Sequence, residues 1–158
     1  MLLNQVDGLI DQPANRQHSL PLAAEACWTT AKYERLEKYV DQSATTSSSF
    51  NIGIGQILLA LANKDNELFA NRIQDLQRAT AQSLTATNTS SLQECQELML
   101  QCHVLAEIEA IGKASVVDNF DKSIILKSFS QRLDIIGPFF THKQYVLGLR
   151  RAAMELSK

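Results

Sequence analysis

Apolar residues recur every three or four positions along most of this chain, which is the spacing of an α-helix that buries one face. The pattern predicts eight helices, at about residues 2–10, 20–30, 33–42, 50–63, from 66 onward, 92–111, 122–136 and 141–156. The polar stretch 80–90 obscures the end of the fifth helix. Apolar and polar residues alternate nowhere for long enough to predict a β-strand. The sequence therefore predicts an all-α fold.

Residues that favour helix ends mark several boundaries. Asp65 is an expected N-cap. Pro21 suits a first helical turn, because the N–H that proline lacks has no helical partner there. A Ser or Thr three residues before a Glu or Gln predicts capping boxes at 91–94 and 141–144. The pair Gly137-Pro138 indicates a stop after the seventh helix.

Between the helices, residues 43–49 form a Ser/Thr-rich linker, and residues 113–121 are expected to form a loop after a sixth helix that ends near Gly112. Short turns between successive amphipathic helices favour antiparallel pairing. The segments 20–42 and 50–84 then make two helix-pair units of the size found in repeat arrays. Periodicity alone leaves a bundle and a solenoid open as alternatives.

The expected core lies where the apolar stripes of these helices meet. The helix that begins at Phe50 is apolar on most sides, which predicts that it is buried between neighbours. On the sixth helix the expected core stripe is Leu92, Cys95, Met99, Cys102 and Ala106. The predicted core and scaffold positions are Trp28, Phe50, Ile54, Gly55, Leu58, Phe69, Ile73, Leu105, Leu133 and Leu149.

The composition argues against a nucleic-acid-binding module and against a membrane-spanning protein. The formal net charge of the 158-residue chain is −2, whereas nucleic-acid modules usually carry a basic excess, so no direct nucleic-acid contact is expected. The longest apolar stretches, such as 57–62, are too short to span a bilayer. The three cysteines, Cys27, Cys95 and Cys102, have irregular spacing and are expected to be buried thiols in a reducing compartment. Together these features predict a soluble intracellular protein with no membrane contact.

The sequence offers little support for catalysis or cofactor binding. Gly53-Ile54-Gly55 lacks the third glycine of a dinucleotide-binding loop and lies in a predicted helix, where small residues favour close helix packing. Cys95, Cys102 and His103 do not have the spacing of a zinc site. His18, expected in a loop, and the other histidines lack a nucleophile motif such as G-x-S-x-G. We therefore expect no catalytic residue, cofactor or metal.

A modest positive face on the last helix is the one candidate contact surface. It comprises Lys143, Arg150 and Arg151, close to His142. Such a face suits an acidic partner, and it equally suits plain solvation or the negative end of the helix dipole.

Several segments, in order and spacing, are similar to one known family. They are 24–28 (Ala-Glu-Ala-Cys-Trp), Tyr33 with 36–39, Phe50 with 54–60, Asp65 with Phe69 and Ile73, His103 with Leu105 and Glu107, 132–133, and 146–152. Together they resemble the FAT region of phosphatidylinositol-3-kinase-related protein kinases, most closely that of the fungal type of the ATR checkpoint kinase. The resemblance spans about residues 20–158 and leaves 1–19 as a short N-terminal helix and loop.

The resemblance implies stacked antiparallel helix pairs in an α-solenoid with tetratricopeptide-like and HEAT-like repeats. It implies a non-catalytic regulatory scaffold within a nuclear DNA-damage checkpoint kinase, which contacts the kinase domain of the same chain and regulatory or dimer partners. Two alternatives remain. A stand-alone helical-repeat adaptor would show a solvated concave surface with polar anchors. A small enzyme with a bundle fold would need a pocket of convergent polar groups.

Overall fold

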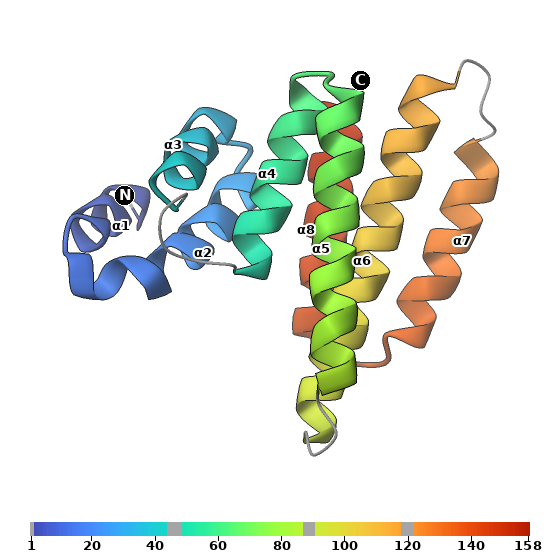
Figure 1. Cartoon of the computed structure of the whole chain (residues 1–158). Coiled ribbons are helices and arrows are strands. Elements are labelled where there is room, and N and C mark those ends of the chain that lie inside the picture. Colours follow the sequence, from blue (N-terminus) through green and yellow to red (C-terminus); the bar gives the residue numbers. More distant parts are fainter. Residues whose placement is uncertain (1, 44–48, 87–90, 118–121) are drawn as a thin grey trace.

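The protein is built from α-helices joined by short connections (Figure 1). The computed structural model describes residues 2–43, 49–86, 91–117 and 122–158. Within these ranges it contains no strand, which confirms the predicted all-α class. The helices are α1 (Leu2–Ile10), α2 (Pro13–Thr29), α3 (Tyr33–Ser43), α4 (Phe50–Ala62), α5 (Asn66–Ala86), α6 (Leu92–Val116), α7 (Lys122–Ile135) and α8 (Phe140–Leu156).

The hairpins α2–α3 and α4–α5 use the same turn. Two residues after the end of each first helix comes a residue in the left-handed region, Ala31 with φ 56° and Lys64 with φ 58°. The next N–H then bonds back five residues, from Lys32 to the Cys27 carbonyl at 2.9 Å and from Asp65 to the Ala60 carbonyl at 3.1 Å. This is the Schellman geometry. The second turn follows the first after about 33 residues, close to the repeat lengths of helix-pair solenoids.

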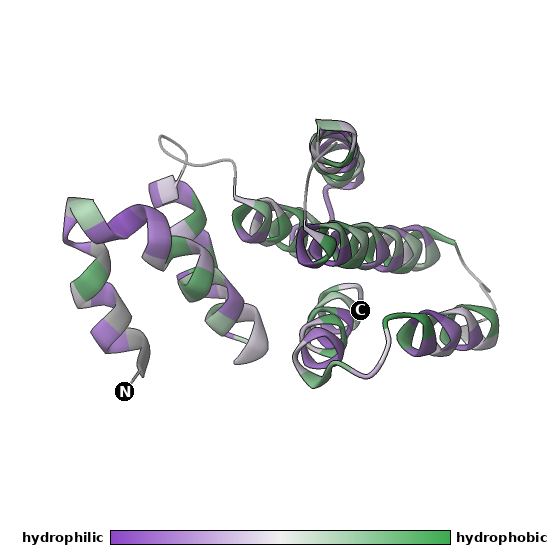
Figure 2. Ribbon diagram, turned by 90° about the horizontal axis from the view of Figure 1, so that it is seen from below, coloured by the Kyte–Doolittle hydropathy of each residue, from purple (hydrophilic) through white to green (hydrophobic). Residues whose placement is uncertain are grey.

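The helices form a solenoid-like row in which neighbours in sequence pack against each other, from α1 on α2 through to α6 on α7. Helices α1–α3 occupy one end of the molecule, and α6 and α7 the other (Figures 1 and 2). The last helix leaves this order, because α8 packs against α2, α4 and α6. In Figure 1 it runs behind α5, between α4 and α6. The C-terminal helix therefore ties separate parts of the row together.

One continuous apolar cluster runs through helices α2 to α8. The predicted scaffold positions that lie buried in it are Trp28, Ile54, Gly55, Leu58, Phe69, Ile73, Leu105 and Leu149. Phe50 and Leu133 are partly buried against it. Helix α4 is buried on most of its surface, as its composition predicts, because α2, α3, α5 and α8 all pack on it.

Close helix packing depends on glycines at two places. On α4, a Cβ added at Gly53 would lie 3.0 Å from the Leu76 side chain, and one added at Gly55 would lie 3.0 Å from Val40. The Gly53-Ile54-Gly55 segment thus serves helix packing. On α6, a Cβ at Gly112 would lie 2.4 Å from two ring atoms of Phe69, so that ring occupies the space a side chain would need.

Two expected helix boundaries are wrong. Helix α2 begins at Pro13, which takes the first-turn position expected for Pro21, so Pro21 lies inside the helix and His18 is helical. The loop expected in residues 1–19 is therefore mostly helix. Helix α6 continues past Gly112 to Val116, because Gly112 is a packing contact and not a helix stop.

The expected helix caps have mixed outcomes. Asp65 accepts from the Leu68 N–H at 2.9 Å, and Ser91 accepts from the Glu94 N–H at 3.3 Å, as predicted for N-caps. The capping box expected at 141–144 is wrong, because α8 already begins at Phe140. The stop after α7 is confirmed by Gly137, whose φ is 88°. The linker expected at 43–49 lies, apart from its two end residues, outside the described residues.

The Phe69–Gly112 contact generates a stability prediction. Gly112→Ala should lower the free energy of unfolding by about 1–2 kcal/mol, because overpacking against the buried ring outweighs the gain in helix propensity. Gly148→Ala is the matched control on α8, where an added Cβ meets nothing within 4 Å. It should raise stability by roughly 0.5–1 kcal/mol. Urea unfolding of both variants tests this, and equal effects of the two substitutions would contradict it.

Candidate functional site

A buried ion pair joins α8 to α6. The Arg150 guanidinium donates to both carboxylate oxygens of Glu107, from Nε at 3.1 Å and from Nη2 at 2.9 Å. The Glu107 side chain is 3% exposed and that of Arg150 is 13% exposed. Two parallel bonds to one carboxylate give both strength and a fixed orientation. This pair therefore sets the position of α8 on α6.

Helix α7 completes the surroundings of Arg150. The Nη2 of Arg150 also donates to the Phe129 carbonyl of α7 at 3.2 Å. The Arg150 guanidinium lies 4.8 Å from the centre of the Phe129 ring. A cation held over an aromatic face and away from water is a favourable arrangement. Arg150 thus connects three helices, α6, α7 and α8, at a single side chain.

A second polar group joins α8 to α4 and α2. The Tyr145 hydroxyl donates to Asn51 Oδ1 at 2.7 Å, and the Asn51 amide faces Glu25 Oε2 at 3.5 Å and the Pro21 carbonyl at 3.4 Å. The Trp28 ring meets Tyr145 edge-on, with centroids 6.3 Å apart. Burial raises the pKa of Tyr145, and the nearby Glu25 charge adds to the effect, so its hydroxyl stays protonated and able to donate.

The C-terminal turns of α8 reach the α2–α3 turn. Arg151 donates to the carbonyl of Thr29, and the Tyr33 hydroxyl donates to Glu155 at 3.2 Å. We call the α8 contacts made by Tyr145, Arg150, Arg151 and Glu155 the α8 seam. Through the seam, one helix holds polar contacts with α2, α3, α4, α6 and α7.

The predicted positive contact surface is wrong for Arg150. Its charge is buried and satisfied by Glu107, so it is not available to an outside partner. Arg151 is exposed but donates to the Thr29 carbonyl, and Lys143 is partly exposed near the start of α8. The structure therefore separates the three residues. The signal for the buried pair is Glu107 itself, an acid within the apolar run of α6 (Val104, Leu105, Ile108).

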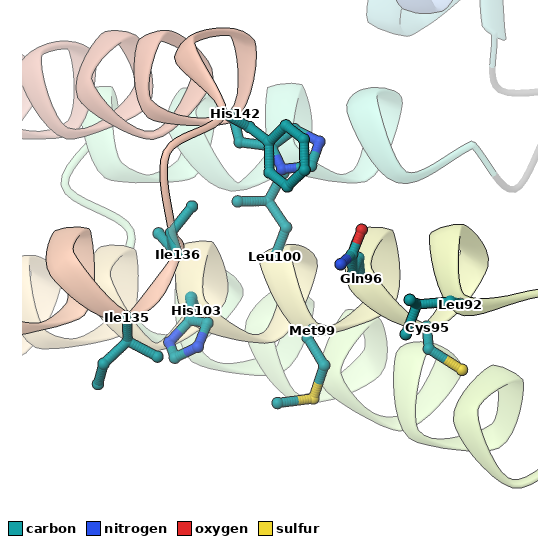
Figure 3. Close-up of a pocket in the computed structure, with 10 residues that line it drawn as sticks. Leu92, Cys95, Gln96, Met99, Leu100, His103, Ile135, Ile136 and His142 are labelled. Atoms are coloured by element: carbon teal, nitrogen blue, oxygen red, sulfur yellow. The ribbon is translucent and has the colours of Figure 1, made fainter.

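An apolar groove lies at the other end of α8 (Figure 3). It encloses about 310 Å³. One wall is the first three turns of α6, through Leu92, Cys95, Gln96, Met99, Leu100 and His103. The other wall comes from the end of α7 and the start of α8, through Ile135, Ile136, Phe139 and His142. We call this feature the α6 groove.

The core stripe expected on α6 is wrong in the first turns of the helix, where the groove lies. Leu92 is 77% exposed and Met99 is 52% exposed, and the deeply buried positions lie later, around Leu105 and Ile108. Cys95 and Cys102 are half-buried and not buried as expected, whereas Cys27 is buried and its pKa is raised by burial to about 11. In the described ranges, no three His, Cys, Asp or Glu side chains converge as a metal site would require.

His103 forms a polar link between α6 and α7 beside the groove. The Arg132 guanidinium donates to His103 Nδ1 at 3.3 Å, which requires an unprotonated Nδ1. Burial lowers the pKa of His103, and the Arg132 charge lowers it further, against a smaller opposite effect of Glu107. The folded protein therefore favours the neutral imidazole.

The comparisons with known proteins assign this architecture. A family model of the FAT domain matches residues 20–158. The chain belongs to the FAT domain family. No solved structure gives a significant match to this FAT chain. None of the helices in the described part of the chain is long and apolar enough to cross a membrane.

The curated relatives that the chain resembles are ATR kinases. The chain is 22% identical over 175 residues to "Serine/threonine-protein kinase ATR" of Oryza sativa subsp. indica, covering 99% of this chain and 6% of the relative. It is 27% identical over 139 residues to the kinase of that name from Arabidopsis thaliana, covering 82% of this chain and 5% of the relative. These findings confirm the resemblance to ATR-like FAT regions. The fungal assignment stays a prediction, because these relatives are plant proteins.

The buried pair generates a double-mutant prediction. Glu107→Met and Arg150→Met should each lower the free energy of unfolding by about 3–5 kcal/mol, because each leaves one buried charge without its partner. The double variant should lose much less than the sum. Urea unfolding of the three proteins measures the coupling, and additive losses would show that the two charges do not depend on each other.

His103 generates a pH prediction. Its folded pKa lies below the ordinary value of 6.5, so the unfolded chain binds more protons as the pH falls through that value. The contribution of neutral His103 to the free energy of unfolding is therefore fully present above about pH 6.5 and is lost at lower pH. His103→Gln keeps an acceptor for Arg132 and does not titrate. Unfolding free energies from pH 8 to 5 should fall more steeply for the native chain, and parallel curves would contradict this.

Proposed function

We propose that this FAT chain is a non-catalytic regulatory scaffold segment of an ATR-like serine/threonine kinase of the DNA-damage checkpoint. The observation that carries the proposal is the FAT match over residues 20–158, together with relatives named as ATR kinases. The proposal includes a nuclear location and packing against the kinase domain of the same polypeptide. It takes residues 1–19 as an N-terminal extension and 20–158 as the FAT-type segment.

The proposed role is mechanical. A regulator bound to one part of a scaffold changes the activity of a distant domain only if it binds the two states of that scaffold with different affinity. The α8 seam suits this role, because it joins the α2–α3 turn, through Thr29 and Tyr33, to α6, through Glu107. A displacement at one end of the row then strains contacts at the other end.

The proposed partners are the kinase domain and regulatory or dimer subunits. The partly exposed Lys143 and the exposed Arg151 remain candidate contacts for them. The alternative is a stand-alone helical-repeat adaptor. The FAT match over residues 20–158 and the relatives named as ATR kinases favour the scaffold over the adaptor. The chain spans about 6% of the length of the rice relatives.

The complete kinase that contains this segment provides the test. Glu107→Gln leaves Arg150 without its ionic partner and should reduce regulator-stimulated phosphorylation of a peptide substrate by several-fold. Gly148→Ala, on the same helix but without contacts to disturb, is the control and should keep full stimulation. Unchanged stimulation in Glu107→Gln, in a chain whose FAT segment is measurably destabilised, would refute the mechanical role.

A further inference from the structure

The α6 groove is a strip of α6 that the other described helices leave partly open. Its α6 positions 92, 95, 96, 99, 100 and 103 recur at intervals of three and four, which places them on one side of the helix. They extend over about three turns, or roughly 16 Å of helix axis. The opposite wall adds Ile135, 71% exposed, and Phe139, 51% exposed. Apolar side chains at this spacing interdigitate best with those of another helix.

The groove is continuous with an interface that the fold already uses. Leu100 packs against the core cluster, and His103 is bonded to Arg132 of α7. Further along α6, Glu107 and the buried Ile108 lie in the part of the helix that α8 and α7 cover. The first three turns of α6 thus continue the apolar strip of the helix, but their residues Leu92 and Met99 stay more than half exposed.

Charge distinguishes the two ends of the groove. Its lining contains no carboxylate among the residues described, and its α8 end holds His142, with Lys143 next in sequence. The N-cap of α8 is Phe139, which makes no side-chain cap bond, so backbone N–H groups and the positive end of the helix dipole lie there. This end therefore favours an acidic group.

From these observations we infer that the α6 groove binds an amphipathic α-helix of a partner segment. Its apolar stripe covers Leu92, Met99 and Ile135, and its acidic side chains face His142, Lys143 and the start of α8. A second copy of this groove is a poorer occupant, because no carboxylate lines it and the acids next in sequence to its lining residues, Glu94, Glu97 and Asp134, are exposed to water. The inference goes beyond the proposed function and does not depend on the identity of the parent kinase.

Binding of designed peptides to the 158-residue chain tests the inference. The probes are two fluorescent 18-residue helical peptides with the same leucine stripe, one with two glutamates and one with two lysines in the first turn. Fluorescence anisotropy should show the glutamate peptide binding several-fold more tightly. Lys143→Glu should reverse this preference. The ratio of the two peptide affinities is compared between the native chain and Lys143→Glu. The difference in helix stability between the peptides is the same in both ratios and cancels.

A matched pair of variants locates the binding surface. Met99→Asp places a charge in the groove and should weaken binding of the glutamate peptide by about tenfold. Leu22→Asp is the control, because Leu22 is a 66% exposed residue of α2 that does not line the groove. Both replace exposed side chains, so both proteins should fold, which circular dichroism verifies.

Four results would overturn the inference. The first is no binding of either peptide to the native chain. The second is equal affinity of Met99→Asp and Leu22→Asp for the glutamate peptide. The third is equal affinity of the native chain for both peptides. The fourth is a dimer of the native chain in sedimentation that Met99→Asp dissociates, which would assign the groove to a second copy.

Discussion

The paired charges of Glu107 and Arg150 are the contact on which the arrangement of α8 depends. Removing two charges from water costs several kcal/mol of solvation free energy, on the order of the attraction between them. The attraction offsets this only when the geometry is good and additional hydrogen bonds are made. Here two bonds join the pair, and the Phe129 carbonyl and ring complete the site around the guanidinium. An arginine displaced along α8 by one residue would lose all of these partners. The pair therefore specifies the register of α8 on α6 more than it adds to stability.

Because α8 packs against helices far from it in sequence, the protein is not an open solenoid in which only neighbouring units touch. In an ideal repeat array each unit contacts only its neighbours, so stability is a sum of local terms. The two hairpins with Schellman turns follow that plan. Helix α8 then contacts α2, α4 and α6 at once, which makes the stability of the first hairpin depend on the last helix. This FAT segment accordingly combines repeat-like construction with the cooperativity of a closed domain.

The helical class and most helix ranges were predictable from the sequence, because apolar periodicity and strong caps such as Asp65 are local signals. The extent of α2 was not, since Pro13 and Pro21 both suit a first turn and only packing decides between them. Gly112 resembled a helix stop, and its contact with Phe69, 43 positions earlier, has no local signature. The α8 seam was missed for the same reason. Periodicity marks an apolar stripe but does not say which helix covers it, which is why the α6 groove was expected to be core.

The distance in sequence between the partners of the α8 seam has a consequence for synthesis. Thr29 and Arg151 are separated by 122 positions, and Asn51 and Tyr145 by 94. A ribosome releases the first two hairpins well before α8 exists, so the side of Trp28 that later meets Tyr145 is open to water or to chaperones during that interval. Contacts between such remote residues also slow the final folding step relative to a purely local helical array. The first two hairpins therefore reach their final stability only after α8 has been synthesised and has packed against them.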